Sequence, residues 1–306
     1  MWISRLIRDG SGRIVDSTLE FAADHKRRTG ERTGAIRNLL DEVSDRETAG
    51  AERVRRSAAG STESGPEPTS PPMTRVRNEL GVPDLTSMPD LRTFLRGSAA
   101  DNKRLEAILS GLNHRYGPYD VHIARADYLD DGNGFTYHAS IRDPTRGTTP
   151  AESIVGILER KIYVDDRGRI VVENRMMDLD EDATGQGFAT AFNSAMETYY
   201  RRSGVDRVTV FATDDGGYVW ARAGYDFDTS PGRLESSVSS ITDKIRSIYN
   251  DCSEADRVQL DDMLSRFEGR VIEYPSPSEL AALSGDDPEL GKKFMMGTAW
   301  YGVRVL

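Results

Sequence analysis

The chain has 306 residues, of which 37% are hydrophobic and 29% charged, and its formal net charge is -10 at pH 7. Residues 1–60 carry twelve Lys and Arg against ten Asp and Glu, which gives them a net charge of +2. The remaining residues therefore have a net charge of -12. Such an acidic body argues against nucleic acid as the main ligand, because phosphate neutralisation requires clustered cations.

A single cysteine, Cys252, excludes an intrachain disulfide and a cysteine-cluster metal site. No run of about 18 apolar residues is present for a membrane span. These features lead us to expect a cytoplasmic protein with no bound metal and no membrane partner.

The first 72 residues are predicted to form a polar arm and a linker. Residues 12–58 are rich in arginine and hold only short apolar stripes at helical spacing, which are too brief to form a core alone. Residues 60–72 are rich in Pro, Ser and Thr, which is typical of an extended linker. We expect residues 1–58 to be partly helical and able to dock a protein partner.

Residues 73–230 are predicted to form the main domain. Two helices are expected at Leu91–Leu95 and Leu105–Leu112. The alternation of Phe135, Tyr137, Ala139 and Ile141 is typical of a half-buried antiparallel strand. Four strands are expected before residue 180, at 120–128, 135–142, 153–164 and 169–177.

A glycine turn follows the fourth strand, with the sequence Thr184-Gly185-Gln186-Gly187-Phe188-Ala189. Glycines at alternate positions let backbone N–H groups converge, and the helix behind them adds the partial positive charge of its N-terminus. The turn therefore predicts a site for an anionic diphosphate. A helix up to Tyr199, a strand at 207–212 and a short helix at 217–222 come next.

Residues 231–306 are predicted to be a helical extension that packs on the domain. Helices are expected at 234–249, 255–267 and 277–283, and Trp300 with Tyr301 is expected to anchor the closing segment.

Residues 169–227 resemble the core of the GNAT superfamily of acyl-CoA-dependent N-acyltransferases. The superfamily's turn, Arg/Gln-Gly-x-Gly-x-Gly/Ala, is matched by Gly185, Gly187 and Ala189, and its later Tyr-x-x-x-Gly-Phe signature is echoed from Trp220 to Tyr225. The resemblance implies an α+β fold with a mostly antiparallel central sheet flanked by helices, here with helical extensions at both ends.

The resemblance also implies a function, the attack of an amine of a peptide, protein or small molecule on acetyl-CoA or another acyl-CoA. Backbone at Thr184, Gly185, Gln186, Gly187, Phe188 and Ala189 would hold the diphosphate. A main-chain N–H between Met177 and Leu179 would polarise the thioester carbonyl. Glu173 is the leading candidate base, with His122 and His138 as competitors.

Two departures from the family pattern leave an alternative open. Thr184 stands where the family has Arg or Gln, and Trp220 replaces a tyrosine that protonates the departing thiolate in many relatives. Tyr218 is the nearest phenol in sequence, although two residues along a helix it points elsewhere. The alternative is a catalytically weak GNAT-like domain that serves as a binding or assembly module through the N-terminal arm.

Overall fold

The computed structural model describes residues 7–8, 14–15 and 81–306. The predicted arm at 1–58 and linker at 60–72 therefore lie outside the described residues, apart from β1 (Ile7–Arg8), which pairs antiparallel with β2 (Ile14–Val15). The described body divides into two compact units. The N-terminal unit consists of residues 81–170 and 175–205, and the C-terminal unit of residues 171–174 and 206–306.

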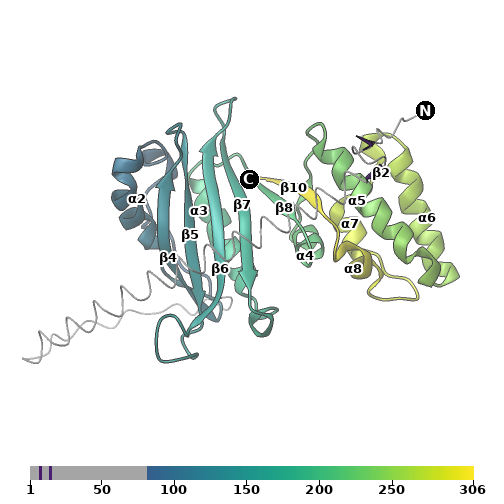
Figure 1. The fold of residues 1–306 in the computed structure, drawn as a ribbon, viewed down its shortest axis with the longest axis horizontal. Helices are drawn as coiled ribbons and strands as arrows, with labels where there is room; N and C mark the ends of the chain where they lie inside the picture. The colour runs from purple at the N-terminus through teal and green to yellow at the C-terminus, as the bar shows by residue number, and fades with distance from the viewer. Residues whose placement is uncertain (1–6, 9–13, 16–80) are drawn as a thin grey trace, which may run out of the picture. The chain divides into compact units, whose positions relative to one another are not determined.

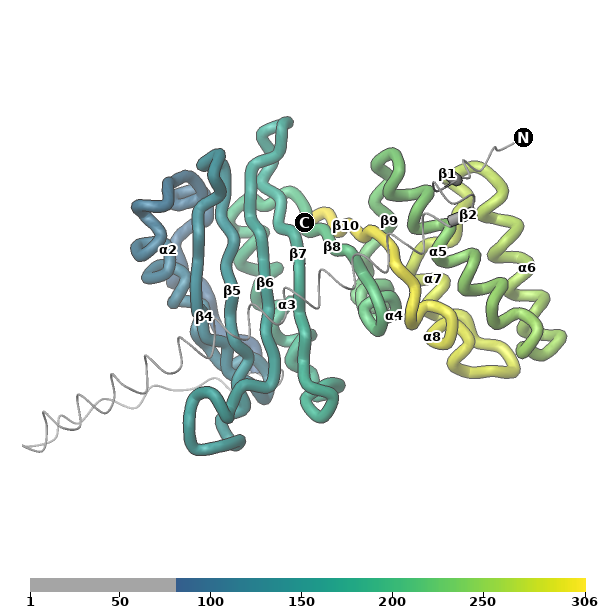
Figure 2. The backbone as a smooth tube through the Cα atoms, in the orientation of Figure 1, coloured from purple at the N-terminus to yellow at the C-terminus, as the bar shows by residue number. Residues whose placement is uncertain are grey.

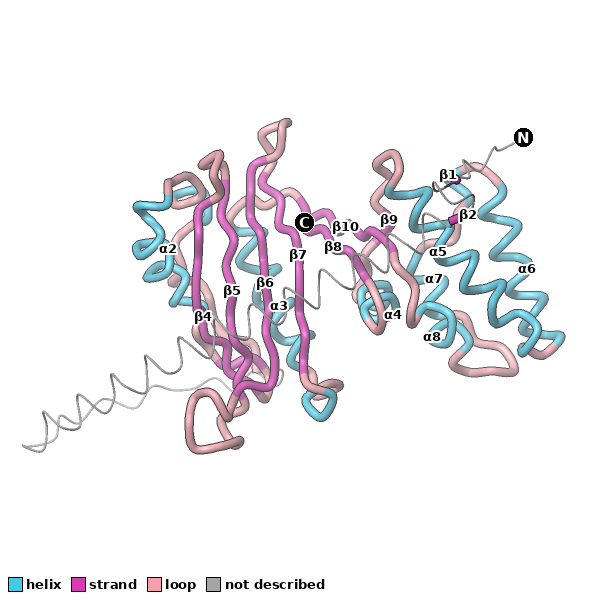
Figure 3. The backbone as a smooth tube through the Cα atoms, in the orientation of Figure 1, coloured by secondary structure: helices cyan, strands magenta, loops and turns pink. Residues whose placement is uncertain are grey.

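The N-terminal unit contains a sheet in which the strands follow one another in chain order (Figures 1 and 3). The pairings of the third to the sixth strand are antiparallel. The four long strands confirm the four that the sequence predicts. The bounds of the short first strand and of these four long strands are β3 (Arg115–Tyr116), β4 (Tyr119–Tyr128), β5 (Gly134–Arg142), β6 (Ile154–Val164) and β7 (Ile170–Leu179).

The helices of this unit differ from the prediction mainly near residue 91. The helix predicted at Leu91–Leu95 is a single 3-10 turn, because Phe94 leaves the helical region at φ -137° and ψ 18°. The helix predicted at Leu105–Leu112 begins earlier and ends in a 3-10 turn. The bounds are η1 (Leu91–Thr93), η2 (Ala99–Asp101), α2 (Asn102–Leu109), η3 (Ser110–Leu112), η4 (Glu181–Ala183) and α3 (Phe188–Arg202).

The apolar stripe of α3 packs against the sheet, as its spacing predicts. Phe188 and Phe192 stack on each other at 5.7 Å, and Phe192 also meets Tyr116 of β3 edge to face at 5.0 Å. The helix ends before Gly204, whose φ of 65° places it in the left-handed region that glycine adopts without steric cost. The core of the N-terminal unit thus lies between α3 and this face of the sheet.

The C-terminal unit contains a short run of paired strands and a set of helices (Figures 2 and 3). Its strands are ordered as the 171–174 segment of β7, then β8, β10 and β9. The bounds are β8 (Arg207–Ala212), α4 (Gly216–Arg222), β9 (Asp226–Phe227), α5 (Arg233–Ile248), η5 (Tyr249–Asp251), α6 (Glu254–Glu268), η6 (Val271–Glu273), α7 (Pro277–Ala282), α8 (Leu290–Met295) and β10 (Trp300–Val305).

Residues 231–306 are not wholly helical as predicted, because the segment ends in a strand. β10 pairs antiparallel with β8 along its whole length and with β9 at two positions. Two serines of α5 hold it, since Ser237 Oγ accepts from Tyr301 N at 3.0 Å and Ser240 Oγ accepts from Ala299 N at 2.9 Å. β10 lies between β8 and β9 in the sheet, and both of these pairing partners are distant from it in sequence.

The order of elements around the glycine turn agrees with the GNAT resemblance. β7, the turn, α3, β8 and α4 follow one another. β7 and β8 pair in parallel, from Val171 opposite Arg207 to Asn174 opposite Val210. The mixed α+β class and the mostly antiparallel sheet that the resemblance implies are therefore present.

Candidate cofactor-binding turn and catalytic residues

The glycine turn lies in the N-terminal unit, between η4 and the first residue of α3. Gly185 has a φ of 71° and Gly187 a φ of 85°, and Gly187 is the N-cap residue of α3. A Cβ added at either glycine would meet no atom within 4 Å. Glycine is required there for backbone conformation rather than for lack of space, and the outer side of the turn is open.

The backbone N–H groups of the turn are available for a ligand. Within the described part of the chain, no N–H of residues 185–190 donates a hydrogen bond, and the first donor of the helix is Ala191 N, which bonds Gly187 O at 3.0 Å. Residues 184–187 are exposed. The turn therefore presents a row of unbonded donors at the N-terminus of a 15-residue helix, which favours a bound anion.

The side chains of the turn point back toward the preceding 3-10 turn or into the core. Thr184 Oγ1 donates to Glu181 O at 2.8 Å, and Gln186 Nε2 donates to Asp182 O at 2.9 Å. Phe188 is buried and Ala189 is partly buried. Gln186 thus holds the turn in shape, and the surface offered to a ligand is mostly main chain.

A cation that the sequence reasoning missed lies beside this turn. Arg146, from the loop between β5 and β6, pairs with Asp180 at 3.3 Å and with Asp182 at 3.7 Å. Glu181 and Asp182 are exposed, so the turn has acidic neighbours as well. No local sequence signal links Arg146 to residues more than 30 positions away, and only the pairing of the strands brings them together.

The candidate residues on β7 are all partly buried. Glu173 is opposite Thr209 of β8 in the parallel register. The register ends at Asn174, and β7 continues beyond it through Met177 to Leu179. These placements leave the proposed roles of Glu173, Met177 and Leu179 as predictions.

His138 belongs to a row of ionisable side chains that crosses the sheet from β4 to β7. It is opposite Arg125 on β4 and Glu159 on β6. Glu159 is 2% exposed and pairs with Arg175 of β7 at 2.8 Å. Burial lowers the pKa of His138, although the Glu159 carboxylate acts in the opposite direction. A neutral imidazole at pH 7 follows, with its buried Nδ1 lacking a hydrogen-bond partner in the described structure.

The aromatic residues around α4 lie in the C-terminal unit. Tyr225 is buried, and its hydroxyl accepts from Asn174 Nδ2 at 3.2 Å. Trp220 meets the Tyr225 ring edge to face at 5.1 Å. Tyr218 lies near Lys292 of α8, whose pKa is raised chiefly by Glu289 and less by Tyr218. Tyr225 is thus the phenol bonded to β7, although the sequence indicates it only as part of a signature and not as a proton donor.

Among the described residues, no helix has both the length and the apolar character that a membrane span requires. Within 81–306, no group of three or more His, Cys, Asp and Glu is arranged to hold a metal ion.

No protein family and no curated protein matches the sequence. Among solved structures, the chain is similar to part of the NatC complex bound to a Gag peptide and CoA, with 14% identity and a TM-score of 0.25, over 29% of this chain and 60% of that one. It is also similar to a Klebsiella pneumoniae chain assigned to the acyl-CoA N-acyltransferases, with 18% identity and a TM-score of 0.24, over 31% and 63%.

A third similar structure is Arabidopsis thaliana NAA60 in complex with a bisubstrate analogue, with 15% identity and a TM-score of 0.26, over 42% and 80%. This chain spans less than two thirds of the length of the first two. At such low identities, the substrates of these proteins are not assigned to this chain.

Proposed function

We propose that this protein is an acyl-CoA-dependent N-acyltransferase that uses acetyl-CoA or a related acyl-CoA and acts on an amine of a peptide, protein or small molecule. One observation carries the proposal, the row of unbonded N–H groups of residues 185–190 around two left-handed glycines at the start of α3. The residues of the turn fit a diphosphate, because an anion with many acceptor oxygens matches several convergent donors.

When bound, acyl-CoA supplies an acyl group activated as a thioester. The chain then has three tasks, which are to hold the diphosphate, to polarise the carbonyl and to move protons. We assign the first to the amides of Gly185 to Ala189 and the second to a main-chain N–H between Met177 and Leu179. Glu173 would accept the proton that the attacking amine must lose.

The leaving thiolate requires a proton, and the chain offers two phenols for it. Tyr218 is the candidate nearest in sequence to the family's tyrosine position. Tyr225 has its hydroxyl on Asn174 at the last parallel pair of β7 and β8. Replacing each by Phe and comparing thiol release distinguishes them, because a Phe side chain keeps the ring and removes only the proton donor.

Ligand-induced stabilisation tests whether the turn binds the cofactor. At a free concentration about 100-fold above the dissociation constant, acetyl-CoA adds about 2.7 kcal/mol to the free energy of unfolding. We expect a matching rise in Tm with acetyl-CoA and none with pantetheine, which lacks the diphosphate. An unchanged Tm with acetyl-CoA and with longer acyl-CoAs contradicts the proposal.

Gly187→Ala is the first variant to compare. Alanine at a φ of 85° is strained by about 1 kcal/mol and displaces the N–H groups on either side. We expect affinity for acetyl-CoA, measured by calorimetry, to fall at least tenfold. Gly168→Ala is the matched control, because Gly168 has a φ of 75° and equally open surroundings in the β6–β7 hairpin. It should lower stability to the same extent and leave affinity unchanged.

A binding or assembly module is the second candidate function. The acids at 180–182 beside the turn favour it, because they repel a diphosphate and are offset among the described residues mainly by Arg146. Under this alternative, neither cofactor binding nor thiol release in the presence of amines is observed.

A further inference from the structure

A cluster of three buried polar side chains lies between α3 and the sheet of the N-terminal unit. Tyr137 of β5 is directly opposite Arg160 of β6, so the two side chains are adjacent on one face. Tyr200 comes from α3, and the Arg160 guanidinium lies 5.7 Å from the Phe192 ring of the same helix. The cluster is therefore formed by two strands and the helix that covers them.

All three side chains are almost completely removed from solvent. Tyr137 is 0% exposed, Arg160 1% and Tyr200 2%. Burial raises the pKa of both tyrosines, so each hydroxyl keeps its proton at neutral pH and can donate.

Each member of the cluster has a polar atom whose hydrogen bonding is incomplete. The Tyr137 and Tyr200 hydroxyls face each other closely enough to interact, and Tyr200 also lies near Arg160. Neither hydroxyl, nor Arg160 Nη2, makes a hydrogen bond of good geometry in the described structure. Arg160 Nη1 is satisfied, because it donates to Met176 O at 2.7 Å and to Glu159 O at 3.1 Å. Since one hydroxyl can accept only the proton of the other, one hydroxyl proton and Arg160 Nη2 still lack an acceptor.

The charge of Arg160 is also uncompensated. No carboxylate of the described residues forms an ion pair with it, and the adjacent Glu159 carboxylate pairs with Arg175 instead. A buried cation without a counter-ion is strongly destabilising, and the Phe192 ring offsets only part of that penalty. The cluster therefore lacks one negative charge and an acceptor for its remaining donors.

We propose that Tyr137, Arg160 and Tyr200 form an internal binding site for a small monovalent anion of the chloride class. A single spherical acceptor can receive these donors and neutralise the guanidinium. A water molecule can exchange hydrogen bonds with the two hydroxyls, but it brings no charge and leaves the guanidinium uncompensated. An oxyanion brings several oxygens into a region that offers few donor groups.

The site has a structural consequence for α3. The anion would join β5 and β6 to the helix, and Arg160 extends the connection to β7 through Met176 O. The N–H-rich turn lies at the start of that same helix. This inference does not rest on the proposed function, because an anion at Arg160 is independent of what the turn binds.

Thermal unfolding of the full chain at matched ionic strength tests the proposal. Sodium chloride or sodium bromide replaces sodium gluconate, whose anion is too large for the site. We expect Tm to rise in a saturable manner, by roughly 3 °C once the halide exceeds its dissociation constant about tenfold. Equal Tm values in chloride and gluconate overturn the proposal.

Three variants separate the site from general stability. Tyr137→Phe and Tyr200→Phe remove one donor each, and we expect the halide-dependent rise to shrink by at least half. Tyr116→Phe is the matched control, because Tyr116 is 0% exposed and contacts Phe192, but its hydroxyl already donates to Leu112 O at 3.0 Å. It should lower Tm and retain the full halide response. An equal response in all three variants contradicts the assignment.

Crystals of the full chain grown in bromide provide the direct observation. An anomalous difference peak between Arg160 Nη2 and the two tyrosine hydroxyls supports the site. A peak at water height without anomalous signal, or no peak, rejects an anion there. A bromide peak combined with a halide-independent Tm indicates an adventitious ion only and also rejects the proposal.

Discussion

At the residue scale, the candidate cofactor turn depends on the main chain more than on side chains. Gly185 and Gly187 set the backbone, while Thr184 and Gln186 bond back to the preceding turn. The sequence pattern could predict the backbone conformation of the turn, because alternate glycines before an apolar helix are compatible with few backbone conformations. It could not predict Arg146, whose place beside Asp180 depends on how a distant loop folds.

Arg146→Gln tests whether this cation assists the turn. An exposed ion pair is worth about 0.2–1 kcal/mol, so we expect acetyl-CoA to bind roughly two- to five-fold more weakly, with a smaller difference at high salt. Isothermal titration at low and high salt measures it. Arg167→Gln, an exposed arginine in the β6–β7 hairpin, is the control and should bind as the unmodified protein does.

Glu173→Gln tests the proposed base. Removing a general base slows proton transfer by about 10²–10⁴-fold while leaving the diphosphate contacts intact. We expect kcat for thiol release to fall by at least 100-fold and affinity for acetyl-CoA to stay unchanged. If His138→Asn produces that loss and Glu173→Gln does not, the base belongs to the row that pairs His138 with Glu159.

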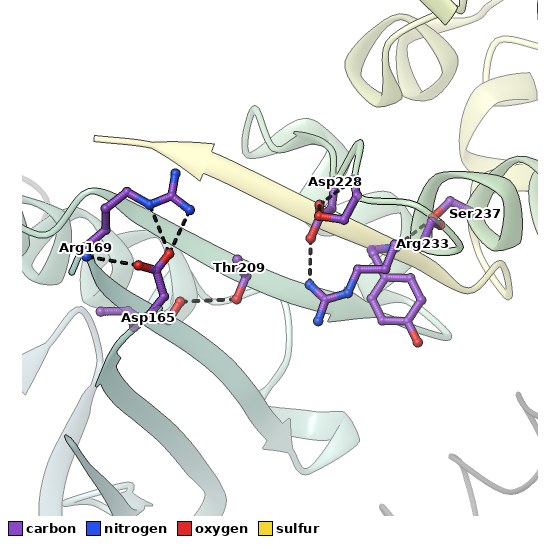
Figure 4. A network of polar contacts seen from close by, with 9 residues as sticks. Asp165, Arg169, Thr209, Asp228, Arg233 and Ser237 are labelled. Carbon is purple, nitrogen blue, oxygen red and sulfur yellow. Dashed lines mark hydrogen bonds and ion pairs between the residues drawn. The ribbon is translucent and has the colours of Figure 1, made fainter. Parts of the chain in front are cut away.

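At the element scale, the β6–β7 hairpin is closed by one acidic side chain (Figure 4). Asp165 accepts from Arg169 Nη2 at 2.7 Å and from the backbone N–H groups of Arg167 and Arg169 at 3.0 Å each. These bonds, above all the one from the Arg169 side chain, lower the pKa of Asp165 to about 2. A second pair, Asp228 with Arg233 at 2.6 Å, similarly joins the segment after β9 to the start of α5 (Figure 4).

Asp165→Asn should destabilise the protein in a pH-dependent manner. The folded pKa is below the unfolded value of 3.8, so the carboxylate's contribution is present above pH 3.8 and is lost as pH falls toward 2. We expect a deficit of about 1 kcal/mol at pH 6 that disappears near pH 2. Urea unfolding at both pH values measures it. Asp166→Asn, at the exposed neighbouring position, is the control and should leave the stability at pH 6 unchanged.

Elements with local signals were predictable from sequence, and those without them were not. α7 has Pro277 at its first turn and Ser276 in a capping box with Glu279, so its start can be read locally. β10 has only six residues, and its pairing partners are β8 and β9. Its strand state depends on those distant partners, which no local pattern reveals.

At the scale of the whole molecule, the C-terminal unit depends on that last strand. Trp300 is 0% exposed, meets Phe227 edge to face at 5.8 Å and donates through Nε1 to Gly217 O at 3.0 Å. It therefore joins β10, β9 and α4 in one core.

Trp300→Ala should cost about 3–5 kcal/mol of unfolding free energy, because it leaves a large cavity and an unbonded Gly217 carbonyl. Chemical denaturation monitored by circular dichroism measures this. Val305→Ala is the control within the same strand, since Val305 is 78% exposed and its truncation should change stability by less than about 0.5 kcal/mol. Equal effects of the two substitutions would show that the Trp300 core is not needed for stability.

The position of β10 at the end of the sequence also delays the pairing of β8 during synthesis. Ala212 of β8 leaves the ribosome 88 residues before its partner Trp300 does. Helices α5 to α8 can form during that interval, while the edge of β8 that later pairs with β10 keeps its backbone N–H and C=O groups unpaired. A nascent chain stalled within this stretch would expose an unpaired, aggregation-prone strand edge. We therefore expect the rate of translation between residues 213 and 299 to determine which fraction of the protein folds and which fraction enters inclusion bodies.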